Sequence, residues 1–173
     1  MAKDFQLKPG DLLLTQNPQG LGKLIRWGQE RLHPGDPAVY SHAAGVLDSC
    51  GNIFESSWRL QVAHISAYHG CLVLVARHKE MDRRRFLRGL EEVWDNLGMV
   101  YPFHRLFFSL FRIADNIYTN WPVCSEYYAQ FLVKAGLYGG WGHTHWAGVT
   151  PDMLEDAVYL GEVWEVVYEG ALI

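Results

Sequence analysis

A proline two residues before a cysteine predicts where one helix of this chain begins. Pro122 cannot lie inside a helix and restricts Trp121 to extended geometry, so we expect the helix to start near Cys124. Apolar side chains then recur at helical spacing before Gly136, a typical helix stop: Tyr127, Tyr128, Phe131, Leu132 and Ala135. Cys124 would then occupy the first turn, where unpaired backbone N–H groups and the helix dipole lower the pKa of a thiol.

A histidine and a glutamate lie on a predicted β-hairpin far upstream of this cysteine. Residues 42–48 and 53–58 are predicted strands, joined by a turn around residues 49–52. In this pairing His42 and Glu55 point to the same face, although an ideal register staggers them along it. A bulge or a strong twist would bring them together.

These three side chains together form a pattern with a chemical meaning. A thiol, an imidazole and an orienting carboxylate are the parts of a cysteine nucleophile for acyl transfer. Each residue also has a plainer interpretation: Cys124 as a buried small side chain, His42 as an exposed strand-end histidine, and Glu55 as a solvated charge. We take all three as candidate catalytic residues because they occur together.

The rest of the pattern alternates short strands and helices. Further strands are expected at residues 11–15, 62–65, 71–76 and 163–168, and helices at residues 20–31 and 82–97. Asp82 is a predicted N-cap, Gly98 a predicted stop, and Thr150 with Pro151 a predicted helix start. We therefore expect an α+β fold, with a small antiparallel sheet packed against helices. The 173 residues suit one core and contain no repeat or linker, so a single domain over residues 1–173 is expected.

Charge and cysteine usage narrow the class of protein. A formal net charge of −4 argues against a general nucleic-acid binder. Three cysteines make no complete disulfide framework and suit a reducing compartment. The first residues contain no apolar signal region, and no later stretch is a credible membrane span. We expect a cytoplasmic protein, unless lysis or a phage particle delivers it elsewhere.

Three short motifs, in a characteristic order, resemble those of one enzyme family. Gly10-Asp11 precedes a hydrophobic strand, Ser41-His42-Ala43-Ala44-Gly45 forms a Ser-His-x-x-Gly strand, and Cys124-Ser125-Glu126 begins a helix. With Glu55 on the intervening strand, the chain resembles permuted papain-like amidases of the NlpC superfamily, in the branch related to lecithin–retinol acyltransferase. Ordinary papain-like enzymes place the cysteine before the histidine, and the permuted branch reverses this order. The resemblance extends over residues 7–137, with Val123 standing where the family often has tyrosine.

The resemblance implies a fold, a site and a reaction. The fold is a permuted papain-like one, with a small, barrel-like antiparallel sheet packed against helices. Cys124 would be the nucleophile, His42 the general base and then acid, and Glu55 the residue that orients His42. The implied reaction is hydrolysis of an amide through a thioacyl enzyme, most simply in a cell-wall peptide or a γ-glutamyl or lysyl peptide. This chemistry needs no metal and no organic cofactor.

Other candidate residues and functions stay open at this point. Asp11 either binds substrate or fixes its strand, and Tyr40 or Ser41 is a candidate second donor to the oxyanion. The aromatic-rich residues 101–118 form either a buried helix or an apolar wall or membrane-surface patch, which would favour a lipid-directed thioesterase or acyltransferase. A non-catalytic binding module or a phage structural component is the second alternative. The histidines within residues 141–146 lack a convincing third ligand, so no metal site is predicted there.

Overall fold

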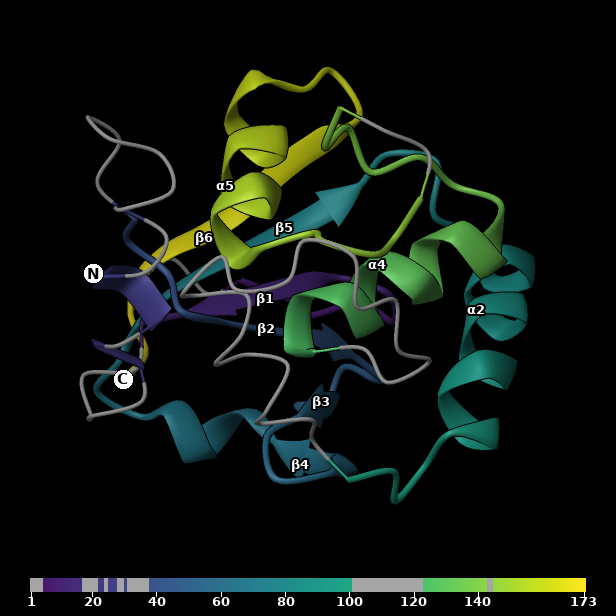
Figure 1. Ribbon diagram of the computed structural model, residues 1–173, viewed down its shortest axis with the longest axis horizontal. Coiled ribbons are helices and arrows are strands. Elements are labelled where there is room, and N and C mark those ends of the chain that lie inside the picture. The colour runs from purple at the N-terminus through teal and green to yellow at the C-terminus, as the bar shows by residue number, and fades with distance from the viewer. Residues whose placement is uncertain are drawn as a thin grey trace, which may run out of the picture.

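Six antiparallel strands form one open sheet at the centre of the protein (Figure 1). The computed structural model describes residues 5–16, 22–23, 25–27, 30, 38–100, 123–142 and 145–173. In chain order the strands are β1 (Leu12–Thr15), β2 (His42–Val46), β3 (Asn52–Ser56), β4 (Leu60–His64), β5 (Leu72–His78) and β6 (Trp164–Ala171). Their order across the sheet is β4-β3-β2-β1-β5-β6.

The α+β class and the antiparallel sheet agree with the prediction, but the expected barrel-like shape does not. The strand order ends at β4 on one side and β6 on the other, and among the described residues these two edges do not pair. The turn between β2 and β3 forms as predicted, because the Asp48 carboxylate accepts hydrogen bonds from the backbone N–H groups of Cys50 and Asn52. Such a side-chain-capped turn sets the register of the hairpin that carries the candidate residues.

Besides the helical residues within 22–30, the described part of the chain forms three α-helices and one short 3-10 helix: α2 (Arg83–Asp95), α4 (Cys124–Ala135), α5 (Pro151–Leu160) and η1 (Ile65–Tyr68). Asp82 caps α2 as predicted, since its carboxylate accepts from the N–H of Arg85 at 2.8 Å. Thr150 caps α5 in the same way, accepting from the N–H of Met153 at 3.1 Å. No described helix is long and apolar enough to cross a bilayer.

Two other predictions, a helix and the aromatic segment, fall partly or wholly outside the described residues. Within the helix predicted at residues 20–31, residues 22–23, 25–27 and 30 are helical. The aromatic segment 101–118 lies wholly outside the described part of the chain.

Helices α2 and α4 lie side by side on one face of the sheet (Figure 1), and a glycine allows them to approach closely. A Cβ atom placed on Gly89 would come within 2.6 Å of the Phe131 ring and 2.7 Å of the Phe131 carbonyl oxygen. Phe131 in turn packs against Phe54 of β3, with ring centroids 5.2 Å apart. Gly89 therefore sets the distance between the two helices, and α4 sits directly on the sheet.

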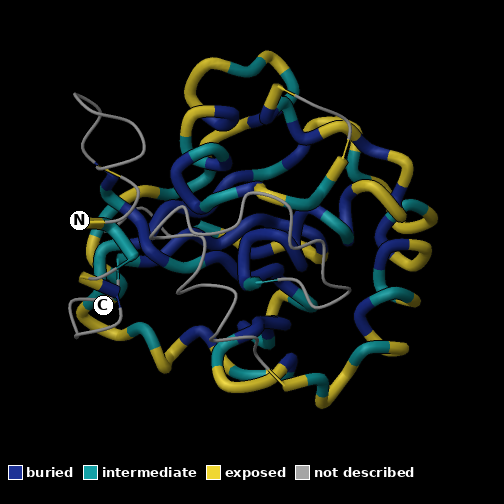
Figure 2. Tube along the Cα trace, viewed as in Figure 1, coloured by how far each residue is buried: buried dark blue, intermediate teal, exposed yellow. Residues whose placement is uncertain are grey.

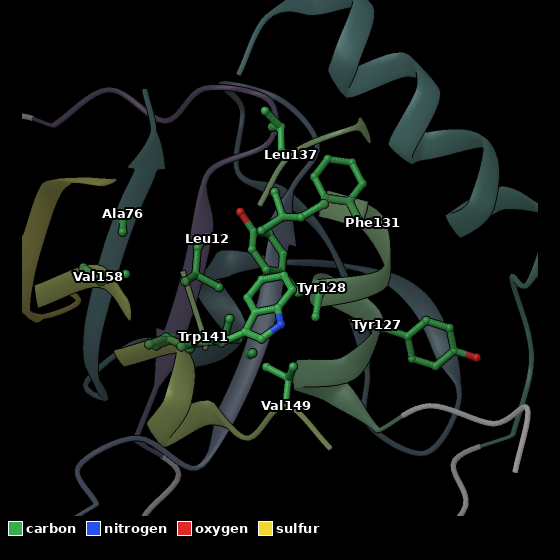
Figure 3. Packing of buried hydrophobic residues seen from close by; sticks show 14 of the residues in the cluster. Leu12, Ala76, Tyr127, Tyr128, Phe131, Leu137, Trp141, Val149 and Val158 are labelled. Carbon is green, nitrogen blue, oxygen red and sulfur yellow. The ribbon is translucent and has the colours of Figure 1, made fainter. Parts of the chain in front are cut away.

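The central strands consist largely of buried residues (Figure 2), and their side chains belong to two hydrophobic layers, one on each face of the sheet. One layer lies between the sheet and the helices, where Figure 3 shows Tyr128 and Phe131 of α4 near Leu12 of β1. The second layer lies on the opposite face and includes Ala44 and Val46 of β2. Because side chains alternate between the faces of a strand, His42 lies on the same face as these two residues.

Candidate active site

His42 and Glu55 meet across neighbouring strands. His42 is the first residue of β2, and Glu55 pairs with Ala44, two residues further along that strand. The two side chains therefore form a diagonal pair on one face of the sheet, a separation that long side chains bridge. His42 Nε2 lies 3.0 Å from Glu55 Oε2. The two residues are staggered along the strands, as predicted. The register is continuous from Ala44–Glu55 to Val46–Ile53, so the two side chains meet because they are long enough to span the stagger.

Cys124 is the first residue of α4, as predicted from Pro122, and its thiol is close enough to the His42 imidazole for each group to shift the pKa of the other. Because Nε2 of the imidazole contacts Glu55, Nδ1 is the ring nitrogen left for the thiol. The backbone N–H groups of Ala43 and Ser125 also lower the pKa of the Cys124 thiol. The imidazole thus interacts with both the thiol and the carboxylate.

The site shifts the titration of all three groups. Burial by itself raises the pKa of the Cys124 thiol, but the charge and hydrogen bond of His42, and then the two backbone donors, lower it below its ordinary value. Burial alone lowers the pKa of His42, yet Cys124 and then Glu55 outweigh it and raise this pKa. The arrangement therefore favours a thiolate paired with an imidazolium, which is the reactive form of a cysteine nucleophile.

Glu55 is held in its charged form by three donors. Burial opposes ionisation of this carboxyl, but hydrogen bonds from His42, Tyr68 and Gln61 lower its pKa to about 2. Gln61 Nε2 donates to Oε1 at 3.1 Å, and the Tyr68 hydroxyl donates to Oε2. The carboxylate is 6% exposed, so these contacts form largely out of water. It is therefore both charged and fixed in orientation.

Tyr68 and Gln61 were not among the residues predicted for the site. Gln61 stands directly opposite Glu55 in the β3–β4 ladder, so extending the predicted hairpin by one strand would have found it. Tyr68 ends the 3-10 helix η1 and has no recognisable sequence signal. Only the packing of η1 against the sheet brings its hydroxyl to Glu55.

The residues after the cysteine hold the start of α4 in place. Glu126 Oε2 accepts from the backbone N–H of Val123 at 2.8 Å, and its Oε1 accepts from the N–H of Gly148 at 2.6 Å. The Ser125 hydroxyl donates to the carbonyl of Val149 at 2.7 Å. The Cys-Ser-Glu sequence therefore ties the loop before α5 to the helix end that presents the thiol.

The three candidate substrate-binding residues lie apart from this arrangement or are buried beside it. Asp11 is 1% exposed, and both of its oxygens pair with Arg77 at 2.8 Å. The Asp11 carbonyl accepts from the N–H of Val46, at the end of β2 opposite His42, so Asp11 links β1 to β2 and β5. The buried Tyr40 hydroxyl donates to Glu169 of β6 at 3.4 Å, and burial followed by Glu169 raises its pKa. Ser41 is 1% exposed, and its N–H donates to the carbonyl of Thr15.

Comparison with known proteins supports the fold alone. No protein-family model matches the chain, and no curated protein matches it. Among solved structures, the chain is similar to the metalloprotein YiiX from Escherichia coli O157:H7, described as DUF1105, with a TM-score of 0.68 and 15% sequence identity. The match covers 96% of this chain and 99% of that one, so the two share an architecture from end to end.

Proposed function

We propose that this protein is a cysteine hydrolase with a permuted papain-like fold. The observation that carries the proposal is the imidazole of His42, whose Nε2 lies 3.0 Å from the Glu55 carboxylate and which interacts with the Cys124 thiol, so that each of these two groups shifts the pKa of the other. A histidine held in this way exchanges its proton with the thiol of Cys124, and the carboxylate of Glu55 stabilises the positive charge of the imidazolium. A low thiol pKa at a helix start has a use in nucleophilic catalysis and none in a purely structural cysteine.

The first half of the reaction forms an acyl enzyme. The Cys124 thiolate attacks the carbonyl carbon of an amide, and the developing oxyanion accepts a hydrogen bond from the N–H of Cys124, which has no partner within α4. As the C–N bond breaks, His42 gives its Nδ1 proton to the leaving amine. The products of this half are a free amine and a thioester on Cys124.

The second half regenerates the thiolate. A water molecule attacks the thioester while neutral His42 takes its proton, and the C–S bond then breaks to release a carboxylic acid. Glu55 keeps the imidazole in one orientation and stabilises the imidazolium at both stages. Peptide amides of the cell-wall, γ-glutamyl or lysyl type are the substrate class that we carry forward, because the lipid-directed alternative depends on residues 101–118, outside the described part of the chain.

A metal does not fit this arrangement of donors. The similar YiiX protein is described as a metalloprotein. Here His42 contacts Glu55 through Nε2 and is left with Nδ1 for Cys124, so the three donors diverge, whereas metal ligands converge on one point. Elsewhere in the described ranges, no group of three or more His, Cys, Asp or Glu side chains is placed to hold a metal ion. We derive no step through a metal.

The proposal is tested by the reactivity of each cysteine across pH. The full-length protein is treated with iodoacetamide between pH 5 and pH 9, and labelling of Cys50, Cys71 and Cys124 is followed by peptide mapping. Cys50 is exposed and serves as the internal reference. We expect Cys124 to react faster than Cys50 at pH 6, well below the free-thiol pKa of about 8.5.

Variants of the other two residues separate activation from simple access. In His42→Ala the advantage of Cys124 at pH 6 should disappear, and in Glu55→Gln it should be reduced. The wild-type protein is then incubated with wall-type peptides, and release of an amine is measured. A peptide that is cleaved by wild type and not by Cys124→Ala is a substrate. A Cys124 that reacts more slowly than Cys50 at every pH, whether or not His42 is present, would refute the proposed function.

A further inference from the structure

We propose that Tyr68 is a positioning residue that fixes the orientation of the Glu55–His42 pair. This inference rests on the proposed function, because it assigns Tyr68 a role in activating Cys124. The Tyr68 hydroxyl donates to Glu55 Oε2, the same oxygen that contacts His42 Nε2. One oxygen thus links the tyrosine to the imidazole.

A second contact joins Tyr68 directly to the histidine. The two rings are stacked, with centroids 5.8 Å apart and an interplanar angle of 29°. The ring therefore limits rotation of the imidazole, while the hydroxyl limits rotation of the carboxylate that orients it. Together these contacts restrict both halves of the pair to one geometry, which is what a preorganised site requires.

The backbone around Tyr68 is held firmly. The imidazole of His64 caps η1 by accepting from the N–H of Ser66 at 3.2 Å, and its Nε2 lies 2.9 Å from the carbonyl of Cys50. At the other end, the N–H of Cys71 donates to the Tyr68 carbonyl at 2.9 Å. The side chain also packs against the second hydrophobic layer. Tyr68 is thus placed by the fold and not by its contact with Glu55.

Its surroundings keep the hydroxyl protonated. Burial first, and then the charge and hydrogen bond of Glu55, raise the pKa of Tyr68 above its ordinary value, with smaller effects from Cys124 and Cys71. The groups that face Glu55 are His42, Tyr68 and Gln61. Tyr68 is therefore a hydrogen-bond donor at every pH at which the site works, and it stabilises the charged form of Glu55.

The test compares Tyr68→Phe with Tyr168→Phe in the iodoacetamide assay. Tyr168 packs against the same layer, but its hydroxyl donates to the carbonyl of Ala171, so it controls for loss of a hydroxyl as such. Without its donor Glu55 supports the imidazolium less well, and the thiolate forms at higher pH. The acid limb is the part of the pH profile in which the labelling rate of Cys124 falls as the pH is lowered. We expect the midpoint of this limb to move up by about 0.5–1 pH unit in Tyr68→Phe and to stay in place in Tyr168→Phe.

A double-mutant cycle with Glu55→Gln shows whether Tyr68 acts through the carboxylate. If it does, Tyr68→Phe adds little to the shift in a Glu55→Gln protein. A residue that merely supports packing would give an additive loss and a lower melting temperature without a shift of the limb. Gln61→Leu is the second variant; it removes the other side-chain donor without touching the ring and should shift the limb in the same direction.

The outcomes distinguish this inference from the proposed function. Slow labelling of wild-type Cys124 overturns both. Fast labelling of wild-type Cys124, with superimposable profiles for Tyr68→Phe and Tyr168→Phe, overturns only the role of Tyr68. A shift in Tyr68→Phe that persists in full in the Glu55→Gln protein also overturns it, because the effect would not pass through the carboxylate.

Discussion

Replacing Glu55 by glutamine should change how the stability of the fold depends on acid. The folded-state pKa of Glu55 is about 2, against an ordinary value of 4.5, because hydrogen bonds from His42, Tyr68 and Gln61 outweigh burial. A group whose pKa is lower in the folded protein binds its proton more readily in the unfolded chain. Its stabilisation is therefore fully present above pH 4.5 and is lost as the pH falls through about 2.

The size of the effect follows from the same shift. A difference of 4.5 − 2 = 2.5 pKa units corresponds to ~3.4 kcal/mol at ~1.36 kcal/mol per unit. Because Glu55 shares its charge interaction with His42 and Cys124, we expect about 2–3 kcal/mol to be attributable to this carboxylate. Glutamine has nearly the same shape but does not titrate, so Glu55→Gln lacks this contribution.

Urea unfolding of both proteins between pH 7 and pH 2.5 measures the difference. The free-energy gap between wild type and Glu55→Gln should be largest near neutral pH and should narrow below pH 4.5. Glu92→Gln is a matched control, since Glu92 pairs with Lys134 at 2.9 Å but that lysine is 56% exposed. The difference in unfolding free energy between wild type and Glu92→Gln should stay below about 1 kcal/mol. A gap for Glu55→Gln that does not change across this range would refute the assigned role of its hydrogen bonds.

Three further changes test the fold around the site. Gly89→Ala should destabilise the protein by about 1–3 kcal/mol in urea unfolding, because the new methyl group would lie 2.6 Å from the ring of Phe131; an unchanged midpoint would contradict the close packing. Asp11→Asn should lower stability by about 3 kcal/mol and leave iodoacetamide labelling of Cys124 unaltered, whereas a substrate-binding role would show as a raised KM without loss of stability. Glu126→Ala removes acceptors for two backbone N–H groups and should slow Cys124 labelling at pH 6 as well as lower the melting temperature; loss of stability alone would argue against coupling to the thiol.

The prediction of helix and strand positions from sequence succeeded where the signals were local. Pro122 and Gly136 bracket α4 as expected, and Gly136 adopts the left-handed conformation that ends a helix. The hairpin turn and the shared face of His42 and Glu55 also follow from neighbouring residues, because strand alternation and turn chemistry act over a few positions. The diagonal contact itself depends on side-chain length, so it did not require the bulge that we considered.

Contacts between distant segments were not predictable in the same way. The role of Asp11 depends on Arg77 of β5, and that pairing exists only because β1 lies between β2 and β5. A barrel-like sheet was expected from the family resemblance, whereas the described strands form an open sheet with β4 and β6 at its two edges. The hydrogen bond from Tyr68 to Glu55 likewise depends on where η1 packs against the sheet.

Local chemistry along the chain was thus enough to place a thiol at a helix start and a histidine and a carboxylate on one face of a hairpin. Only the packing of α4 against β2 and β3 brought Cys124 to His42. Helix caps, turns and the alternation of side chains along a strand depend on residues a few positions apart, so they can be predicted without knowing the rest of the fold. The distance between a helix and a strand is set by close-packed side chains from many segments, such as the approach of α2 and α4 at Gly89, and that information is spread over the whole fold.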